Sequence, residues 1–137
     1  MKIAKLPLAT LGLSFLTACG DKGELEGLWE GVSVISDGED VTNDYIYSYT
    51  DGECTYSYRW FMVLDDKARG GLFSESKTEC GSESYSNSYG VYLNFEKSAG
   101  KWVSSIGDYG FECTAPAKSE IECGANDEMV FRFRRGN

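Results

Sequence analysis

CTYSYRWFMVL, residues 54–64, is the stretch that decides the fold of this chain, together with GGLFSESKTEC, residues 70–80. Both stretches are rich in aromatic, β-branched and small polar residues, lack proline, and show no helical periodicity, which is typical of β-strands. The link between them is short, with turn residues at Ala68-Arg69-Gly70-Gly71, and links of this kind join antiparallel neighbours. We therefore predict that the two stretches form one long antiparallel hairpin.

The register of this hairpin follows from placing Cys54 opposite Cys80. Large side chains then face small ones on the sulfur-bearing side, in the pairs Tyr56/Thr78, Tyr58/Ser76, Trp60/Ser74 and Met62/Leu72. On the other side the register sets Arg59 against Glu75 and Phe61 against Phe73, and each such pair contributes roughly 0.2–1 kcal/mol. A slip by one residue would separate all of these pairs, so the register is well determined.

The rest of the chain after about Gly27 also reads as strands separated by Gly and Asp turns. We expect strands near 27–36, 44–50, 53–64, 70–80, 88–95, 100–106, 108–114, 119–124 and 128–135. The Ser- and Tyr-rich segment Gly81 to Ser88 is expected to be an exposed loop. Short antiparallel strands must bury one face, so the sequence predicts an all-β fold, an up-and-down barrel of about eight or nine strands. A β-sandwich is the alternative.

The five cysteines divide into Cys19 and four later ones, none in a C-x-x-C spacing. Each of the four follows a glutamate, and neighbouring side chains on a strand face opposite ways, so the acid is expected to face water and the sulfur the core. A second hairpin places Cys113 opposite Cys123. Among the three possible connectivities we therefore predict the disulfides Cys54–Cys80 and Cys113–Cys123, each contributing about 2–4 kcal/mol.

The N-terminus has the layout of a secretory signal, with Lys2 and Lys5 before an apolar run that extends to Leu16. Its end, Leu16-Thr17-Ala18-Cys19, resembles the lipobox of bacterial lipoproteins. The resemblance implies cleavage before Cys19 and attachment of fatty acyl chains such as palmitate to that residue. The alternatives are a secretory protein cut at Ala18 or an uncleaved membrane helix, although the run is shorter than the roughly 20 residues that a span needs.

The lipoprotein resemblance also implies a location. The family's inner-membrane retention signal is an aspartate directly after the cysteine, whereas here Gly20 holds that place, which favours the outer membrane of the cell envelope. Two or more acyl chains suffice to hold a protein to a membrane without a span. The chain is thus divided into a signal peptide, 1–18, a lipidated N-terminus and tether, 19–26, and one antiparallel β domain, 27–137.

Gly27-Leu28-Trp29 opens the first expected strand and resembles the G-x-W motif of the lipocalins. In that family the tryptophan closes the barrel floor, and an arginine from the last strand packs against it. Arg132 or Arg134 is the expected partner, because both share the alternate face of Val130. The resemblance implies a lipocalin-like barrel that holds a small ligand.

The composition of the chain argues against most classes of catalytic and cofactor chemistry. The chain has no histidine and a net charge of −9, and it contains no glycine-rich phosphate-binding motif. His-dependent catalysis is therefore excluded, nucleotide chemistry lacks its motif, and an acidic surface disfavours nucleic acids and acidic lipids as partners. The acid-rich segment from Asp37 to Asp44 fails the calcium-loop pattern at Val41 and reads as a solvated hairpin loop. We expect no enzymatic activity, no cofactor and no metal.

Aromatic residues alternate along the deciding hairpin and suggest a ligand site. Tyr56, Tyr58 and Trp60 face the small Ser74 and Ser76 in the predicted register, which would leave a space lined by rings and hydroxyls for a small apolar or amphipathic ligand. The alternative is a solid barrel, filled by these side chains, that serves a structural or protein-interaction role. A third possibility is that Phe61 and Phe73 form an outer apolar patch that docks a protein partner or the membrane.

Overall fold

The strands of this chain join a single antiparallel sheet in the computed structural model, which describes residues 22–106, 109–126 and 128–136. The all-β antiparallel fold is therefore confirmed. The elements are, in chain order, the 3₁₀ turn η1 (Lys22–Leu25), β2 (Gly27–Ser36), β3 (Glu39–Asp40), helix α2 (Thr42–Tyr45), β4 (Tyr47–Asp51), β5 (Cys54–Leu64), β6 (Arg69–Cys80), β7 (Glu83–Asn94), β8 (Glu96–Ser98), β9 (Lys101–Ile106), β10 (Tyr109–Ala117), β11 (Glu120–Asn126) and β12 (Met129–Arg135).

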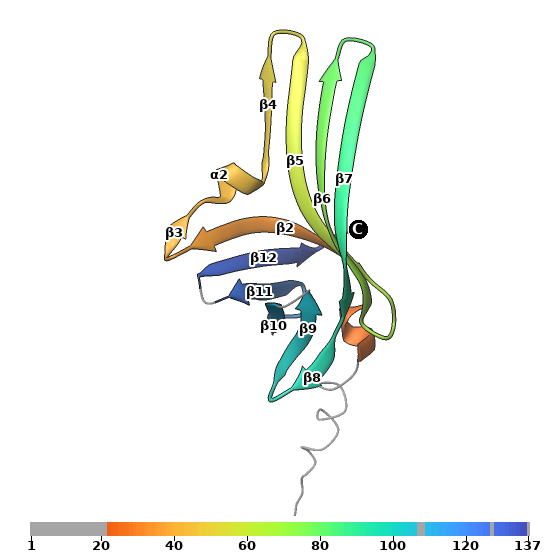
Figure 1. Cartoon of the computed structure of the whole chain (residues 1–137), viewed down its shortest axis with the longest axis vertical. Coiled ribbons are helices and arrows are strands. Elements are labelled where there is room, and N and C mark those ends of the chain that lie inside the picture. Colours follow the sequence, from red (N-terminus) through yellow and green to blue (C-terminus); the bar gives the residue numbers. More distant parts are fainter. Residues whose placement is uncertain (1–21, 107–108, 127, 137) are drawn as a thin grey trace, which may run out of the picture.

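The sheet follows the up-and-down order of a barrel. Its strands run β7-β6-β5-β2-β12-β11-β10-β9-β8, with β3 added to β2 and β4 added to β5. The first long strand therefore pairs with the last, and the hydrogen-bonded order ends at β7 and β8, which follow each other in the chain. The result is one sheet curled into a half-barrel, without a second stacked sheet among the described residues (Figure 1).

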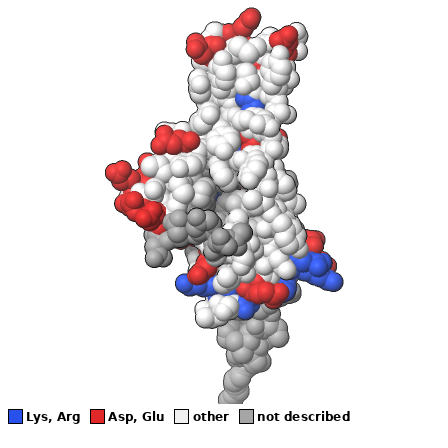
Figure 2. All heavy atoms as spheres, viewed as in Figure 1, with Lys and Arg blue, Asp and Glu red and all other residues white. Residues whose placement is uncertain are grey.

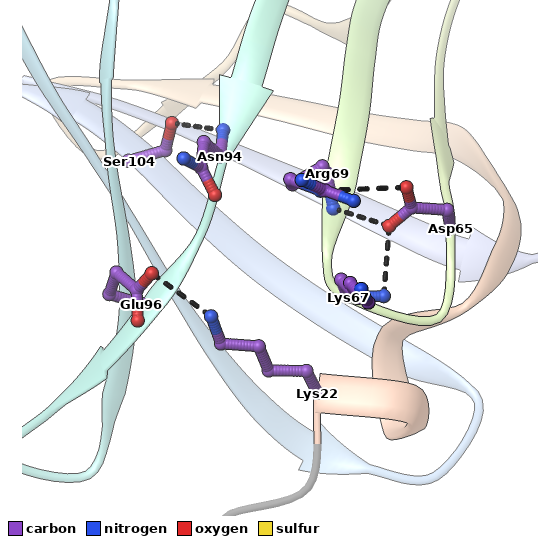
Figure 3. Close-up of polar contacts among 7 residues, drawn as sticks. All are labelled: Lys22, Asp65, Lys67, Arg69, Asn94, Glu96 and Ser104. Carbon is purple, nitrogen blue, oxygen red and sulfur yellow. Dashed lines mark hydrogen bonds and ion pairs between the residues drawn. The ribbon is translucent and has the colours of Figure 1, made fainter.

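One hydrogen bond crosses the break in the order at the lower end of the sheet: the Asn94 N–H of β7 donates to Ser104 Oγ of β9 at 2.9 Å, as Figure 3 shows. The next residue, Phe95, continues the pairing of β7 with β6, since its N–H donates to the Ala68 carbonyl at 2.9 Å. Phe95 itself is 1% exposed. The residue that connects the two ends is thus part of the core.

Large side chains from alternate strand positions fill the interior of the half-barrel. All of the largest are under 2% exposed, among them Trp29, Met62, Leu93, Phe95, Phe111, Ile121 and Phe133. Cys113 and Cys123 lie in the same core. Packing of this kind is the main source of fold stability, and it fills the space that a lipocalin-like barrel would offer to a ligand.

The upper parts of β5, β6 and β7 extend beyond the half-barrel and form, with β4, a four-stranded arm (Figure 1). β4 pairs with residues 54–58 of β5, whereas β2 pairs with residues 61–64 of the same strand. All of β4 is exposed, and so is β7 from Glu83 to Gly90. The arm is therefore a single layer with two accessible faces.

The predicted hairpin register is confirmed at every pair. Cys54 lies opposite Cys80, and the pairing continues without a shift to Leu64 and Gly70. The charge pair is present, with Arg59 Nε donating to Glu75 Oε1 at 2.8 Å, and the Phe61 and Phe73 rings stack with centroids 5.2 Å apart. Both predicted disulfides, Cys54–Cys80 and Cys113–Cys123, are formed.

Two local predictions were wrong. The segment 81–88 is not an exposed loop: its only turn is at the start, and Glu83 onward belongs to β7. The expected start of the strand near 44 is helical, because Thr42–Tyr45 form α2 before β4 begins. Helix α2 is tied to the half-barrel, since the Val34 N–H donates to Thr42 Oγ1 at 3.0 Å.

The arginine that covers Trp29 is Arg135, so the choice of Arg132 or Arg134 was wrong. Phe131 and Phe133 face the core, and Arg135 shares their alternate positions, whereas the expected pair lies on the outer face. Arg135 Cζ lies 4.1 Å from the centroid of the Trp29 ring, and its guanidinium donates to the carbonyls of Glu24 and Glu26. Arg132 and Arg134 instead pair with glutamates of β11.

The described chain begins at the floor of the half-barrel. Leu25 of η1 is 3% exposed, and its carbonyl accepts the Trp29 Nε1–H at 2.9 Å. Lys22 donates to Glu96 at 2.9 Å, as Figure 3 shows. The predicted signal peptide and Cys19 lie outside the described residues. In the described part of the chain no helix is long and apolar enough to span a bilayer.

The turn between β5 and β6 is built by Asp65 (Figure 3). Its carboxylate accepts the N–H groups of Arg69 at 3.0 Å and Lys67 at 2.8 Å. These hydrogen bonds, that from Arg69 first, hold the pKa of Asp65 below its ordinary value. Ala68 takes φ of 59° within this turn and is fully buried, which fixes the spacing of the two long strands at their lower end.

Candidate ligand cleft at the mouth of the half-barrel

The face of the arm that continues the core face of the half-barrel is lined with tyrosines; we call it the inner face. Its rings contact one another along and across strands: Tyr49 stacks on Tyr56 with centroids 5.2 Å apart, and Tyr47 lies 5.9 Å from Tyr58. The register adds Tyr85 opposite Thr78 and Tyr89 opposite Ser74. The inner face is thus aromatic and hydroxyl-bearing from the tip of the arm to the half-barrel.

A cleft of about 320 Å³ lies where the inner face meets the mouth of the half-barrel. Its wall is supplied by helix α2, by β5, β6 and β7 at the base of the arm, and by β9, β10 and β12. Its lining side chains are all aromatic or aliphatic and are Tyr45, Trp60, Leu72, Tyr89, Val91, Ile106, Phe111, Met129 and Phe131. A volume of this size, enclosed by apolar side chains, is in the range of small-molecule sites.

Trp60 is the central residue of this cleft. Its ring lies 5.4 Å from that of Phe131 and 6.1 Å from that of Tyr58, so it connects the half-barrel to the arm. Its Nε1 is buried and is the one such side-chain polar atom without a hydrogen-bond partner in the described part of the chain. An unpaired buried donor costs roughly 1–3 kcal/mol, which a hydrogen-bond acceptor would recover.

The structure separates the predicted ligand residues into two groups. Trp60 lines the cleft, and Ser74 lies beside it at 8% exposure, opposite both Trp60 and Tyr89. Tyr56, Tyr58 and Ser76 are on the same face but farther along the arm, where no cleft encloses them. The half-barrel interior is packed, so the enclosed volume is at the mouth and not inside.

Several cleft residues were not predicted from the sequence. Tyr45 belongs to a helix that was expected to be strand, and Tyr89 and Val91 lie on the expected strand 88–95, for which no pairing partner was predicted. Ile106 and Met129 come from elements far from Trp60 in the chain. The alternation of Met129 with Phe131 and Phe133 was a usable signal, because it places Met129 on the core side of the last strand.

The outer face of the arm carries the predicted Phe61/Phe73 pair. Arg59 covers part of it, with its Cζ 4.4 Å from the Phe61 centroid. Val63 is 45% exposed, and Tyr92 is 65% exposed beside the same two rings. An apolar patch therefore exists here, but its centre is a closed stack.

A second cleft, of about 520 Å³, lies at the floor of the half-barrel. Trp29 and Trp102 form its apolar part, and each is covered by a cation: Arg135 lies over Trp29, and Lys97 Nζ is 4.6 Å from the Trp102 centroid. The two cations are thus already engaged by the aromatic rings.

Charge is distributed unevenly over the molecule. Figure 2 shows acidic side chains at the tip of the arm and beside helix α2, while Lys and Arg lie mainly at the floor end of this face. Of the described residues that line the mouth cleft, none is charged. Among the described residues no cluster of three or more Cys, Asp or Glu has the arrangement of a metal site. The cleft is therefore suited to a neutral apolar molecule.

Comparison with known proteins gives no further assignment, since no protein-family model, no curated protein and no solved structure matches the chain.

Proposed function

We propose that this chain is a lipid-anchored lipoprotein of the cell envelope whose lipocalin-like half-barrel binds a small apolar or amphipathic ligand in the mouth cleft. The observation that carries the ligand proposal is the apolar cleft of about 320 Å³, which is lined by Trp60, a residue whose buried Nε1–H has no hydrogen-bond partner. A ligand with an apolar body and one hydrogen-bond acceptor matches both features. The lipocalin likeness is supported by Trp29 under Arg135 at the junction of the first and last strands.

The first test measures whether the cleft binds an apolar probe. N-phenyl-1-naphthylamine, a neutral dye that fluoresces in apolar surroundings, is titrated against the full-length protein. Val91→Phe fills the cleft, so we expect it to weaken dye binding at least tenfold. Val63→Phe is the matched control, because Val63 is 45% exposed on the outer face and lies outside the cleft. Equal binding by the two variants would remove the cleft as the site.

The second test addresses the Trp60 N–H. Trp60→Phe keeps an aromatic ring and removes the donor. The ketone 2-acetylnaphthalene has an acceptor, and 2-ethylnaphthalene is similar in size without one, and both can compete with the dye. We expect the substitution to lower severalfold the affinity for the ketone relative to that for 2-ethylnaphthalene, because the donor that would bond the ketone oxygen is then absent. An unchanged preference would show that Trp60 does not bond the ligand.

The alternative function is a structural or protein-interaction lipoprotein with a solid domain, and the packed interior of the half-barrel favours it. Denaturing extraction of the purified protein followed by mass spectrometry, with a thermal-shift screen of lipids and aromatics, separates the two functions. A co-purifying ligand, or a shift that Val91→Phe abolishes, supports ligand binding. No ligand, no shift and no dye binding would leave the solid-domain function.

A further inference from the structure

The arm presents an unprotected sheet edge along β7. Within the described chain the only ladder partner of β7 is β6, and the register between them runs from Cys80 opposite Glu83 to Arg69 opposite Asn94 without a bulge. The other side of β7 is at the margin of the arm, with no element beside its upper length (Figure 1). Its outward N–H and C=O groups from Glu83 to Gly90 therefore form a template for another strand.

Sheet edges are usually blunted by short length, charge, proline or bulges. The other margins of this sheet are short: β3 is two acidic residues, β8 is three residues that include Glu96 and Lys97, and β4, at the opposite edge of the arm, is five residues ending in Asp51. β7 departs from the rule, because its twelve residues include no proline and no charge after Glu83. The molecule thus protects its short edges and leaves its longest one open.

The sequence of this edge is self-complementary. Residues 84–89 read Ser-Tyr-Ser-Asn-Ser-Tyr, which is nearly symmetric about Asn87. When two copies pair antiparallel about Asn87, Tyr85 lies opposite Tyr89 of the other copy, and Ser86 lies opposite Ser88. In this pairing odd-numbered residues lie opposite odd-numbered residues, and even opposite even. The N–H and C=O groups that point away from β6 in one copy therefore meet the corresponding groups of the other copy. The inner faces of the two arms lie on the same side of the joined sheet.

Charge favours the same arrangement. Each copy carries a net charge of −9, so most surfaces of two copies repel. The segment 84–92 is neutral, and Figure 2 shows acidic side chains at the tip of the arm. Antiparallel pairing about Asn87 places Glu83 opposite Val91 and keeps the two acidic tips at opposite ends. A parallel pairing would bring the tips together.

From these observations we propose that β7 is a homodimerisation edge, at which a second copy of this chain adds its own β7 antiparallel about Asn87. The contact uses the same patch on both copies and is closed by a two-fold axis. It joins two four-stranded arms into one eight-stranded sheet with a continuous tyrosine face. The proposal is independent of the mouth cleft and of the lipid anchor.

The first experiment tests the register by cysteine cross-linking of the full-length protein. Only residue 87 lies opposite itself in the proposed pairing, so Asn87→Cys is expected to give a disulfide-linked dimer on a non-reducing gel. Ser84→Cys is the matched control, because it is on the same edge and is expected to lie opposite Gly90 of the other copy. Failure of Asn87→Cys to cross-link, or equal cross-linking of both variants, would overturn the register.

The second experiment tests whether like charges placed on β7 weaken self-association, which is measured by sedimentation velocity of the full-length protein in density-matched detergent. Asn87→Lys and Asn87→Glu each place like charges together at the two-fold axis, and we expect each to weaken self-association at least about tenfold. Residue 87 faces Ser76 within its own arm, so either charge is tolerated there. An equimolar mixture of the two variants is expected to restore the dimer.

The control for the second experiment is Ser48→Lys, which puts the same charge on β4, the opposite edge of the arm. It is expected to leave the dimer intact. Loss of association in Ser48→Lys alone, or assemblies that grow beyond dimers, would show that β4 is the edge in use and would overturn the proposal. A wild-type protein that stays monomeric at every concentration would overturn it as well.

Discussion

Phe73 shows how single residues shape the outer face of the arm. Its ring lies over two glycines, one beside it on β6 and one opposite it on β7. A Cβ added at Gly71 would come within 2.7 Å of the ring, and one added at Gly90 within 2.6 Å. The ring has little room to retreat, because it stacks on Phe61, which is in turn covered by Arg59. The two glycines thus provide the space that the aromatic pair needs.

We predict that Gly90→Ala destabilises the protein by about 1–3 kcal/mol, because the new methyl group overlaps the Phe73 ring. The measurement is the urea midpoint of unfolding, with the slope of the transition compared between variants. Gly110→Ala is the control, because a Cβ at Gly110 meets no atom within 4 Å. The control is expected to be neutral or slightly stabilising, since alanine restricts the unfolded chain. Equal midpoints for the two variants would contradict the prediction.

The sequence predicted the Phe61/Phe73 pair, but not the glycines under it or the arginine over Trp29. The pair follows from the register of one hairpin, which alternation and cysteine placement determine. Gly90 acquires its role only through the pairing of β7 with β6, which sets it opposite Phe73 and which was not predicted. Arg135 was missed because Arg132 and Arg134 were read from the face of Val130, whereas the core face is that of Phe131 and Phe133.

At the scale of elements, the two disulfides stabilise different parts of the sheet. Cys113 and Cys123 are 1% and 0% exposed in the core, whereas Cys54 and Cys80 are partly exposed at the tip of the arm. The arm is a single layer, so it buries little apolar surface from Thr55 to Tyr58. The tip disulfide is therefore the main restraint on the end of the arm.

We predict that mild reduction opens Cys54–Cys80 before Cys113–Cys123, because a thiol reductant reaches the exposed sulfur first. Amide hydrogen exchange is then expected to rise in the upper parts of β5 and β6, while β10 to β12 keep their protection. Mass spectrometry after alkylation identifies which cysteines were reduced. Reduction of the core disulfide at the same rate, or loss of protection in β11, would show that the arm and the half-barrel unfold as one unit.

Most strands were predictable from the sequence because each shows its own alternation of apolar and polar residues and ends at a turn. Residues 83–88 were the main exception: serine alternates there with Tyr85 and Asn87, a composition that is typical of a loop. Pairing with β6 makes these residues strand, since β6 offers partners from Cys80 to Glu75. Helix α2 was missed for a similar reason, because a single turn of four residues has no periodicity to detect.

At the scale of the whole molecule, the mouth cleft results from the curling of the sheet into a half-barrel. Residues from Tyr45 to Phe131 meet there only because β2 pairs with β12 and because β7 leads into β8. No local sequence pattern indicates contacts between residues of such distant elements. The sequence therefore predicted Trp60 and the face on which it lies, but not the position of the cleft. The packed interior below the cleft could not be predicted either, since a filled and a hollow barrel share the same alternation.

The two ends of the molecule differ, and this difference gives the proposed lipid anchor a testable role. The described chain starts at the floor of the half-barrel, a few residues after Cys19, and the arm points to the opposite end (Figure 1). An anchor on Cys19 would therefore hold the floor, where Lys and Arg gather, against the membrane and direct the acidic tip away from it (Figure 2). The mouth cleft and β7 would then both face the aqueous compartment.

We predict that radiolabelled palmitate is incorporated into the wild-type chain and that Cys19→Ser abolishes the label and releases the protein from the membrane fraction. The physical reason is that each buried methylene contributes about 0.8 kcal/mol, so loss of the acyl chains removes the membrane affinity. Cys54→Ser is the control, because it removes a cysteine of the domain and is expected to keep the label. Cell fractionation measures release, and labelling measures acylation. Palmitate that persists in Cys19→Ser, or a wild-type chain that is never labelled, would exclude the anchor.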